Sequence, residues 1–362
     1  MTRMSTSNPY SATRVPDLSV VMPYFNQPEE LARALEDILR QQDVTLEVLV
    51  VDDASERKAD NIVACYQKRG LPVSLLRQPK RAYTLAARLR GMRVARGRWL
   101  AFMDSDDGLC GPDVYAKIIS AAEKTPDVDI LHYLTMTEGE PATLRDKTLP
   151  VSMCGRYLWD WPYAAPFHDA PLHGSEIFHT WLLRGCRAHS VWNKLYSRRL
   201  YTRLLELRHD IPITRIEDFY LTAHFLFFAK KYVPCYTSVY KYSPPTTNHL
   251  LKLAGRMTDA IRMLQTLPGR FSAMGLDKSD CCHLYTYLRK LVTINTGHMC
   301  RQYLKITNGS IDLKMQQPDE IDILNQYNIS GEVFLALAVA TASNSRKLKN
   351  IVNILNFDTD IQ

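Results

Sequence analysis

The chain has 362 residues, of which 46% are hydrophobic and 23% charged, and its formal net charge is +7. This composition is typical of globular proteins and excludes fibrous and intrinsically disordered ones, and the length allows one large domain or two ordinary ones. The positive charge is modest and spread along the chain, so it suits an anionic ligand or a loose membrane-surface contact and does not predict nucleic-acid binding.

The cysteines and the N-terminus predict where the protein resides. Eight cysteines are irregularly spaced without a Cys-x-x-Cys pair, which is typical of reduced thiols inside the cell. Residues 1–16 are polar, lack the apolar core of a secretory leader and are expected to form a flexible tail. No apolar run reaches the roughly 18 residues that a spanning helix needs. We expect a cytoplasmic protein and leave open a peripheral contact with the inner face of the membrane.

Segments typical of strands and helices alternate from Leu18 to Tyr133. Apolar runs predict strands at 18–22, 46–51, 73–76, 99–103 and 128–133. Apolar residues at helical spacing predict helices between them, opening at Pro28, containing Val63 and Tyr66, and covering 82–95 and 112–124. This alternation predicts an α/β fold with a mostly parallel sheet and helices on both faces.

An acidic cluster follows the strand predicted at 99–103 and consists of Asp104, Asp106 and Asp107. So much like charge on one turn is unfavourable unless a cation neutralises it. The carboxyl ends of such strands bind ligands, and carboxylates are ligands that Mg²⁺ and Mn²⁺ prefer. The cluster therefore predicts a divalent-metal site for a phosphorylated ligand. The alternative is a strand-to-loop turn in which an Asp caps a helix and Gly108 supplies the turn.

The loop after the first strand, residues 23–27, reads Pro-Tyr-Phe-Asn-Gln and contains no glycine. It therefore does not match the glycine-rich fingerprint of dinucleotide-binding folds, and the chain has no Walker loop. A bound phosphate would need another source of positive charge, which favours the metal hypothesis.

Four blocks in order resemble the nucleotide-binding half of family 2 glycosyltransferases with the GT-A fold. They are Ser-Val-Val-Met-Pro-Tyr-Phe-Asn at 19–26, Val-Val-Asp-Asp-Ala-Ser at 50–55, Ala-Arg-Leu-Arg-Gly-Met-Arg-Val-Ala-Arg-Gly at 87–97 and Phe-Met-Asp-Ser-Asp-Asp at 102–107. The resemblance implies a nucleotide-sugar donor, with UDP the family's commonest nucleotide. It also implies an Asp-x-Asp motif for Mn²⁺ or Mg²⁺ and inversion at the anomeric carbon.

The resemblance implies donor contacts from residues in these four blocks: Pro23, Tyr24, Asn26, Asp52, Asp53, Arg88, Asp104, Ser105 and Asp106. Pro23 and Tyr24 would line the base, and Asp53 would accept a hydrogen bond from it. For Asp52 the alternative is a cap on the following helix. For Arg88, which Leu89 follows where the family usually has asparagine, the alternative is a solvated helix position. Asp106 is the expected direct metal ligand, Asp104 would face the ribose or the metal, and Asp107 is an alternative ligand.

Two later segments extend the resemblance. Residues 190–196 resemble a Trp-Asn-Lys-hydrophobic-Tyr block of capsule- and wall-polysaccharide members, which implies acceptor contacts from Trp192, Asn193 and Lys194. For Lys194 a structural salt bridge is the alternative. Glu217 and Asp218 open an apolar helix, where the helix dipole favours acids. The resemblance implies that Asp218 is the catalytic base and Glu217 its neighbour.

The expected organisation is a glycosyltransferase domain at 17–250, with a nucleotide-binding half at 17–135 and an acceptor-binding half at 136–250, and a helical region at 251–362. The resemblance implies an inverting hexosyl or N-acetylhexosaminyl transferase that acts on a glycan or lipid-linked acceptor in polysaccharide biosynthesis. Two alternatives are a phosphatase with an aspartyl nucleophile and a catalytically silent nucleotide-sugar-binding protein. The sequence does not determine the oligomeric state.

Overall fold

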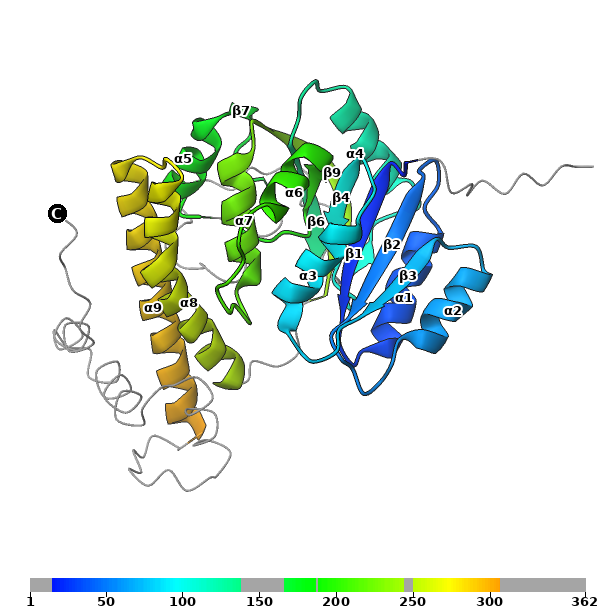
Figure 1. Ribbon diagram of the computed structural model, residues 1–362, viewed down its shortest axis with the longest axis horizontal. Coiled ribbons are helices and arrows are strands. Elements are labelled where there is room, and N and C mark those ends of the chain that lie inside the picture. Colours follow the sequence, from blue (N-terminus) through cyan, green and yellow to red (C-terminus); the bar gives the residue numbers. More distant parts are fainter. Residues whose placement is uncertain (1–14, 138–165, 187, 244–249, 307–362) are drawn as a thin grey trace, which may run out of the picture. The chain divides into compact units, whose positions relative to one another are not determined.

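The computed structural model describes residues 15–137, 166–186, 188–243 and 250–306 (Figure 1). The chain divides into two compact units. The first contains the described residues up to Asp210 and from Glu217 to 243, and the second contains 211–216 and the residues from 250 onward. Residues 138–165 of the expected acceptor-binding half and residues 307–362 of the expected helical region lie outside the described residues.

The first unit is built on a nine-stranded sheet with the order β3-β2-β1-β4-β8-β6-β9-β5, in which β7 pairs with β9. The strands are β1 Leu18–Tyr24, β2 Leu46–Asp52, β3 Val73–Arg77, β4 Trp99–Phe102, β5 Gly108–Leu109, β6 Ile130–Thr137, β7 Leu172–His173, β8 Lys194–Ser197 and β9 Lys231–Tyr242. Strands β1 to β4 run parallel to one another. β8 is antiparallel to both of its neighbours, β4 and β6.

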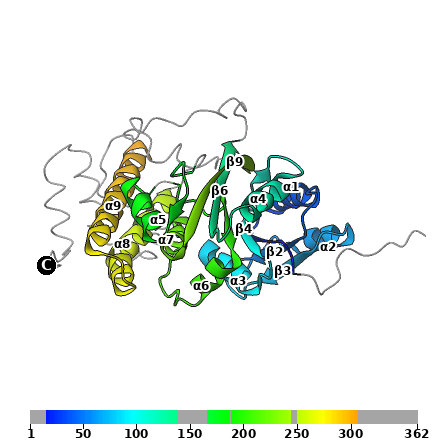
Figure 2. The same ribbon diagram turned by 90° about the horizontal axis from the view of Figure 1, so that it is seen from above.

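Helices cover both faces of this sheet, with α1 and α4 on one face and α3 and α6 on the other (Figure 2). The helices of the unit are α1 Pro28–Leu39, α2 Asp60–Lys68, α3 Tyr83–Val94, α4 Val114–Glu123, α5 Ser175–Leu183, α6 Arg198–Leu205 and α7 Glu217–Phe228. The predicted α/β fold with a mostly parallel sheet and helices on both faces is therefore confirmed.

The sequence explains why the central strands are buried and where the loops gather. Every residue of β2 is buried, and so is nearly every residue of β1, because both strands are almost continuous apolar runs. In α1, Pro28 occupies the first turn with two acids, and the buried side chains recur at helical spacing. Since β1, β2 and β4 are parallel, the loops after them meet at one edge of the sheet.

The helix α3 lies close to β1 at Gly91, inside the block at 87–97. A Cβ atom on Gly91 would lie 2.4 Å from the Cγ1 atom of Val21. We expect Gly91→Ala to lower the free energy of unfolding by about 1–3 kcal/mol, because overpacking a close contact forces α3 away from the strand. Gly111→Ala is the control, since its new methyl would meet no neighbour closer than 3.8 Å. Urea unfolding of both variants measures the difference, and equal stabilities would contradict the explanation.

The second unit contains two long helices, α8 Leu250–Ala273 and α9 Lys278–Ile306. Asp259 on α8 is buried, and its Oδ2 atom accepts backbone N–H groups of Thr214 at 2.8 Å and Arg215 at 2.6 Å. One helical carboxylate thus fixes the short segment 211–216 within this unit. Among the described residues, no helix combines the length and the apolarity needed to cross a bilayer.

Candidate active site

The acidic cluster lies at the carboxyl end of β4, where the chain turns and the N–H of Asp107 donates to the carbonyl of Asp104. Asp104 is 30% exposed, and its Oδ1 atom accepts a hydrogen bond from Arg88 at 2.7 Å. Asp106 is exposed. The alternative in which one of these acids caps a helix is wrong, because the next helix, α4, begins at Val114.

Asp107 points to β9 and not to the other two acids. Its buried carboxylate accepts the hydroxyl of Tyr240 at 2.6 Å and the N–H of Ser243 at 2.8 Å. Burial and the charges of Asp104 and Asp106 raise the pKa of Asp107 well above its usual range. Asp107 as the alternative metal ligand is therefore not supported. The Tyr240 hydroxyl also accepts the N–H of Asp104 at 3.0 Å.

Arg88 connects the acidic cluster to the start of α7. Its guanidinium pairs with Asp104, with Glu217 at 3.3 Å and with Asp218, although the side chain is only 1% exposed. The alternative of a solvated helix arginine is therefore wrong. The donor contact implied for Arg88 stays a prediction. Neither partner on α7 was expected from the sequence, because they follow Arg88 by about 130 positions and no local pattern joins them.

Glu217 and Asp218 are the first residues of α7, where the helix dipole favours negative charge. Their side chains are 13% and 22% exposed. Burial raises the pKa of Glu217 to about 7; the charge of Asp218 adds to the rise, and Arg88 opposes it. The pair is thus partly exposed and is linked to Asp104 through a shared partner, Arg88.

Two of the side chains implied as donor contacts, Tyr24 and Asn26, bind the backbone of Arg57 in the loop after β2. Tyr24 is buried, and its hydroxyl donates to the carbonyl of Arg57. Asn26 has a positive φ of 57°, and its Oδ1 atom accepts the N–H of Arg57 at 3.0 Å. Pro23 is half-buried, while Ser105 is buried with its hydroxyl 3.5 Å from Gln27 Oε1. Donor contacts from these residues stay predictions.

Asp52 and Asp53 also organise loops. Asp52 is fully buried, accepts the N–H of Ser55 at 2.9 Å and pairs with Arg77 at 3.1 Å. Its predicted cap on the following helix is wrong, because α2 begins only at Asp60. The Asp53 carboxylate accepts three hydrogen bonds, from Gln78 Nε2, the N–H of Ala82 and the N–H of Tyr83. It therefore fixes the loop before α3, and its contact with a base stays a prediction.

The Trp-Asn-Lys block forms the start of β8 and the loop before it. Lys194 is fully buried, and its ammonium donates to the carbonyls of Ala188 and Ser190 and to Oδ1 of Asn193. It makes no salt bridge with any described residue, so that alternative is wrong. Trp192 is 4% exposed and stacks on Tyr240 at 4.7 Å. Because Asn193 is also fully buried, this block serves the core in the structure, and its acceptor contacts stay a prediction.

Asp104 and Asp106 fit a divalent cation that also binds phosphate oxygens. Loss of hydration and the charge of Asp104 raise the pKa of the exposed Asp106 to about 6, a repulsion that a cation would relieve. Within the described ranges no group of three or more His, Cys, Asp or Glu side chains could hold a metal. Sites with only one or two carboxylates suit Mg²⁺, which keeps several waters and takes further oxygens from substrate phosphates.

Comparison with known proteins identifies the family. Residues 19–184, which contain the acidic cluster and Arg88, match the family model "Glycosyl transferase family 2". Residues 19–184 thus form a glycosyl transferase family 2 domain. It is 34% identical over 154 residues to the succinoglycan biosynthesis protein ExoO of Rhizobium meliloti. That match covers 40% of this chain and 43% of the relative, so the chain spans less than half of the relative's length.

Solved structures support the fold of this chain. The S. aureus TarS fragment 1–349 in complex with UDP-GlcNAc aligns with a TM-score of 0.51 and 16% identity, covering 93% of this chain and 92% of that one. The mannosyltransferase PcManGT of Pyrobaculum calidifontis, in complex with GDP-Man and Mn²⁺, aligns with a TM-score of 0.50 and 14% identity, covering 91% and 87%. At these identities the likeness establishes a GT-A fold.

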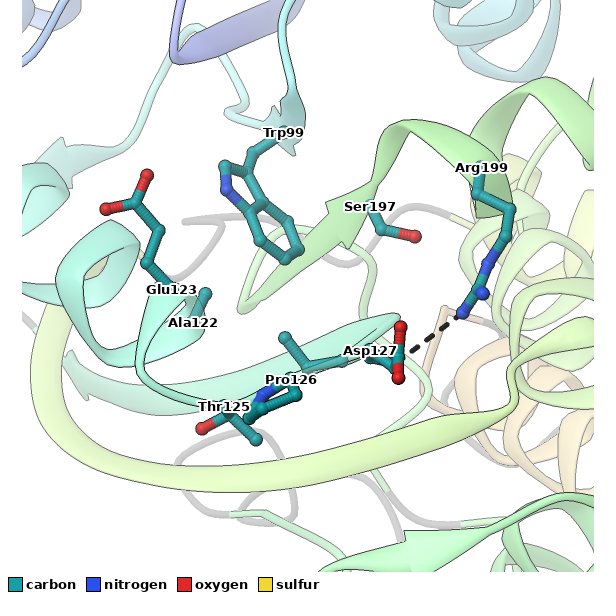
Figure 3. A pocket seen from close by; sticks show the side chains of 9 residues that line it. Trp99, Ala122, Glu123, Thr125, Pro126, Asp127, Ser197 and Arg199 are labelled. Carbon is teal, nitrogen blue, oxygen red and sulfur yellow. Dashed lines mark hydrogen bonds between the residues drawn. The ribbon is translucent and has the colours of Figure 1, made fainter.

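A recess of about 360 Å³ lies at the other end of β4 in the first unit (Figure 3). Its lining includes Trp99, the first residue of β4, together with Glu123, Ser197 and Arg199. Arg199 donates a hydrogen bond to the carbonyl of Asp127 (Figure 3). It also forms an ion pair with Asp129. The recess is therefore separate from the acids that follow β4, and its arginine already has a carboxylate partner.

The raised pKa of Glu217 predicts a pH-dependent effect of Glu217→Gln on stability. A pKa of about 7 in the folded protein, against 4.5 ordinarily, means that the folded state binds the proton more tightly. Stability from this group is therefore complete below pH 4.5 and is lost as the pH rises through 7. We therefore compare the free energy of unfolding of Glu217→Gln with that of the wild type at both pH values. We expect the difference, variant minus wild type, to be about 2 kcal/mol larger at pH 8 than at pH 5.

Urea unfolding at the two pH values measures this gain. Glu176→Gln is the control, since Glu176 is an exposed acid in the first turn of α5. A stability difference that does not change with pH for Glu217→Gln would contradict the assignment.

Proposed function

We propose that this chain is an inverting glycosyltransferase, of the hexosyl or N-acetylhexosaminyl type, that transfers a sugar from a nucleotide-sugar donor to a hydroxyl of a glycan or lipid-linked acceptor. One observation carries the proposal: Asp104, at the end of β4, and Asp218, at the start of α7, pair with the same guanidinium. The acid of the Asp-x-Asp motif and the candidate base therefore lie on two sides of one small site.

On the donor side, Asp106 and Asp104 would hold Mn²⁺ or Mg²⁺. The cation would supply positive charge beside the donor phosphates, which would stabilise the leaving nucleoside diphosphate. The complexes of TarS with UDP-GlcNAc and of PcManGT with GDP-Man and Mn²⁺ support a nucleotide-sugar donor and a divalent metal. UDP is the first nucleotide to test, because it is the commonest in the family.

On the acceptor side, Asp218 accepts the proton of the attacking hydroxyl. A positioned base of this kind contributes roughly 10²–10⁴ in rate. The hydroxyl oxygen attacks the anomeric carbon opposite the leaving diphosphate, which inverts its configuration. Glu217 is the neighbouring acid, and burial raises its pKa to about 7. The choice of Asp218 over Glu217 as the base follows the family resemblance. The name of the succinoglycan relative supports a role in polysaccharide biosynthesis.

A thermal-shift screen of nucleotide sugars tests the donor class. UDP-GlcNAc, GDP-Man and further UDP-sugars are added with Mn²⁺, with Mg²⁺ and with EDTA, and release of nucleoside diphosphate is then measured for those that raise the melting temperature. We expect stabilisation that EDTA removes, followed by turnover. Binding without turnover across an acceptor panel would indicate a silent binding protein. Hydrolysis of p-nitrophenyl phosphate without any response to nucleotide sugars would indicate a phosphatase and contradict the proposal.

A further inference from the structure

Arg88 is the cation shared by three carboxylates of this site. Its Nη2 atom lies 2.7 Å from Asp104 Oδ1, and its Nη1 atom contacts Glu217 Oε1 at 3.3 Å as well as Asp218 Oδ1. The guanidinium carbon lies 5.7 Å from the centre of the Phe102 ring, at the end of β4. The side chain is thus enclosed, and its two terminal nitrogens face acids from two different elements.

This geometry needs a guanidinium. An arginine buried this deeply must be paired, because an unpaired buried charge is strongly destabilising. The group is planar and rigid, so its two nitrogens fix the distance between the acids that they bind. An ammonium group is a point charge and cannot hold Asp104 and Asp218 at set positions at the same time. The position of α7's first turn relative to the end of β4 therefore depends on Arg88.

We propose that Arg88 is a positioning residue that holds the Glu217–Asp218 pair against Asp104 and competes with the divalent cation for Asp104. This inference rests on the proposed function, and it differs from the donor contact that the family resemblance implies. Arg88 neutralises Asp104 as long as the cation is absent, and it fixes Asp218 at the distance that the attacking hydroxyl requires. The same side chain therefore affects both donor binding, through Asp104, and proton transfer, through Asp218.

Titration with Mn²⁺ alone, followed by electron paramagnetic resonance, tests the competition without any donor. The full chain is compared with Arg88→Met and with the control Arg98→Met. Arg98 also bridges two carboxylates, Asp17 at 2.6 Å and Glu123 at 2.7 Å, but it precedes β4 and is half exposed. We expect Arg88→Met to bind Mn²⁺ about tenfold more tightly or better, because a positive charge beside Asp104 is removed. Unchanged or weaker binding would overturn the competition.

Turnover tests the positioning. With whichever of UDP-GlcNAc or GDP-Man the wild type consumes, we expect Arg88→Met to lower kcat about 100-fold while the donor KM stays within about threefold, since small misplacements of a reacting group have effects of this size. A loss confined to KM would make Arg88 a donor contact and overturn the proposal, as would an unchanged kcat. If Arg88→Met does not fold, Arg88→Lys is measured in its place, since it retains the charge. A lower kcat with a nearly unchanged donor KM would again support the positioning role, and a loss confined to KM would overturn it.

The two hypotheses fail in different ways. A wild-type protein that consumes no donor contradicts the proposed function, and the Mn²⁺ titration then decides the role of Arg88 alone. A wild-type protein that turns over while Arg88→Met shows neither tighter Mn²⁺ binding nor a lower kcat retains the proposed function and contradicts the positioning role.

Discussion

Asp218→Asn is expected to lower turnover by about 10²–10⁴, because the amide cannot accept the proton of the attacking hydroxyl. Affinity for the donor should stay nearly unchanged, since Arg88 keeps Asp104 and Glu217 as partners. The measurement is kcat for release of nucleoside diphosphate, together with calorimetric titration of the nucleotide in Mn²⁺. A variant that retains activity would show that Asp218 is not the base.

Asp60→Asn is a matched control for this substitution. Asp60 also lies in the first turn of a helix and also pairs with an arginine, Arg77, but it belongs to α2. We expect it to leave kcat unchanged. Glu217→Gln tests the other acid of the pair and should retain more activity than Asp218→Asn. The reverse order would assign the base to Glu217.

Asp106→Ala is expected to remove the metal dependence of nucleotide binding. Asp106 is the exposed acid of the cluster, whereas Arg88 occupies one oxygen of Asp104. Loss of even an outer-shell partner weakens metal affinity about 10–100-fold, so loss of this ligand should reach at least about 100-fold. Titration calorimetry with UDP in Mn²⁺ and in EDTA measures the change. Unaltered Mn²⁺-dependent binding would contradict the assignment of Asp106.

Asp107→Asn separates the neighbouring acid from the metal site. Asp107 accepts hydrogen bonds from Tyr240 and Ser243, so its replacement should change stability more than metal affinity. If Asp107→Asn abolishes Mn²⁺-dependent binding while Asp106→Ala does not, the two acids have been assigned the wrong way round.

The Arg88 contacts change how the family blocks are understood. The block at 87–97 resembles a donor-binding segment, and in the structure it also supplies Gly91, where α3 meets β1, and the arginine that reaches α7. Likewise, the carboxylate of Asp53 holds the loop before α3. Several side chains of these blocks therefore fix the loops and helices that surround the site. They do so whether or not they also contact a donor.

The antiparallel strand β8 shows a feature that sequence reasoning did not reach. The sequence of residues 190–196 resembles an acceptor-binding block, but Lys194–Ser197 inserts between β4 and β6 and buries its lysine. Strand periodicity carries no information on which strands pair across a hundred positions. A charged residue in a short motif is also ordinarily exposed, and only the three oxygen acceptors around Lys194 explain its burial.

The sequence by itself determined the α/β class, the early strands and helices and the position of the acids after β4, because hydrophobic periodicity is a local property of the chain. It also provided the blocks by which the family was recognised. Only the tertiary structure decided which acids face each other: Asp104, Glu217 and Asp218 meet at Arg88, while Asp107 turns to Tyr240. The physical reason is that ion pairing in a buried site depends on distance in space, which strand order and helix packing set.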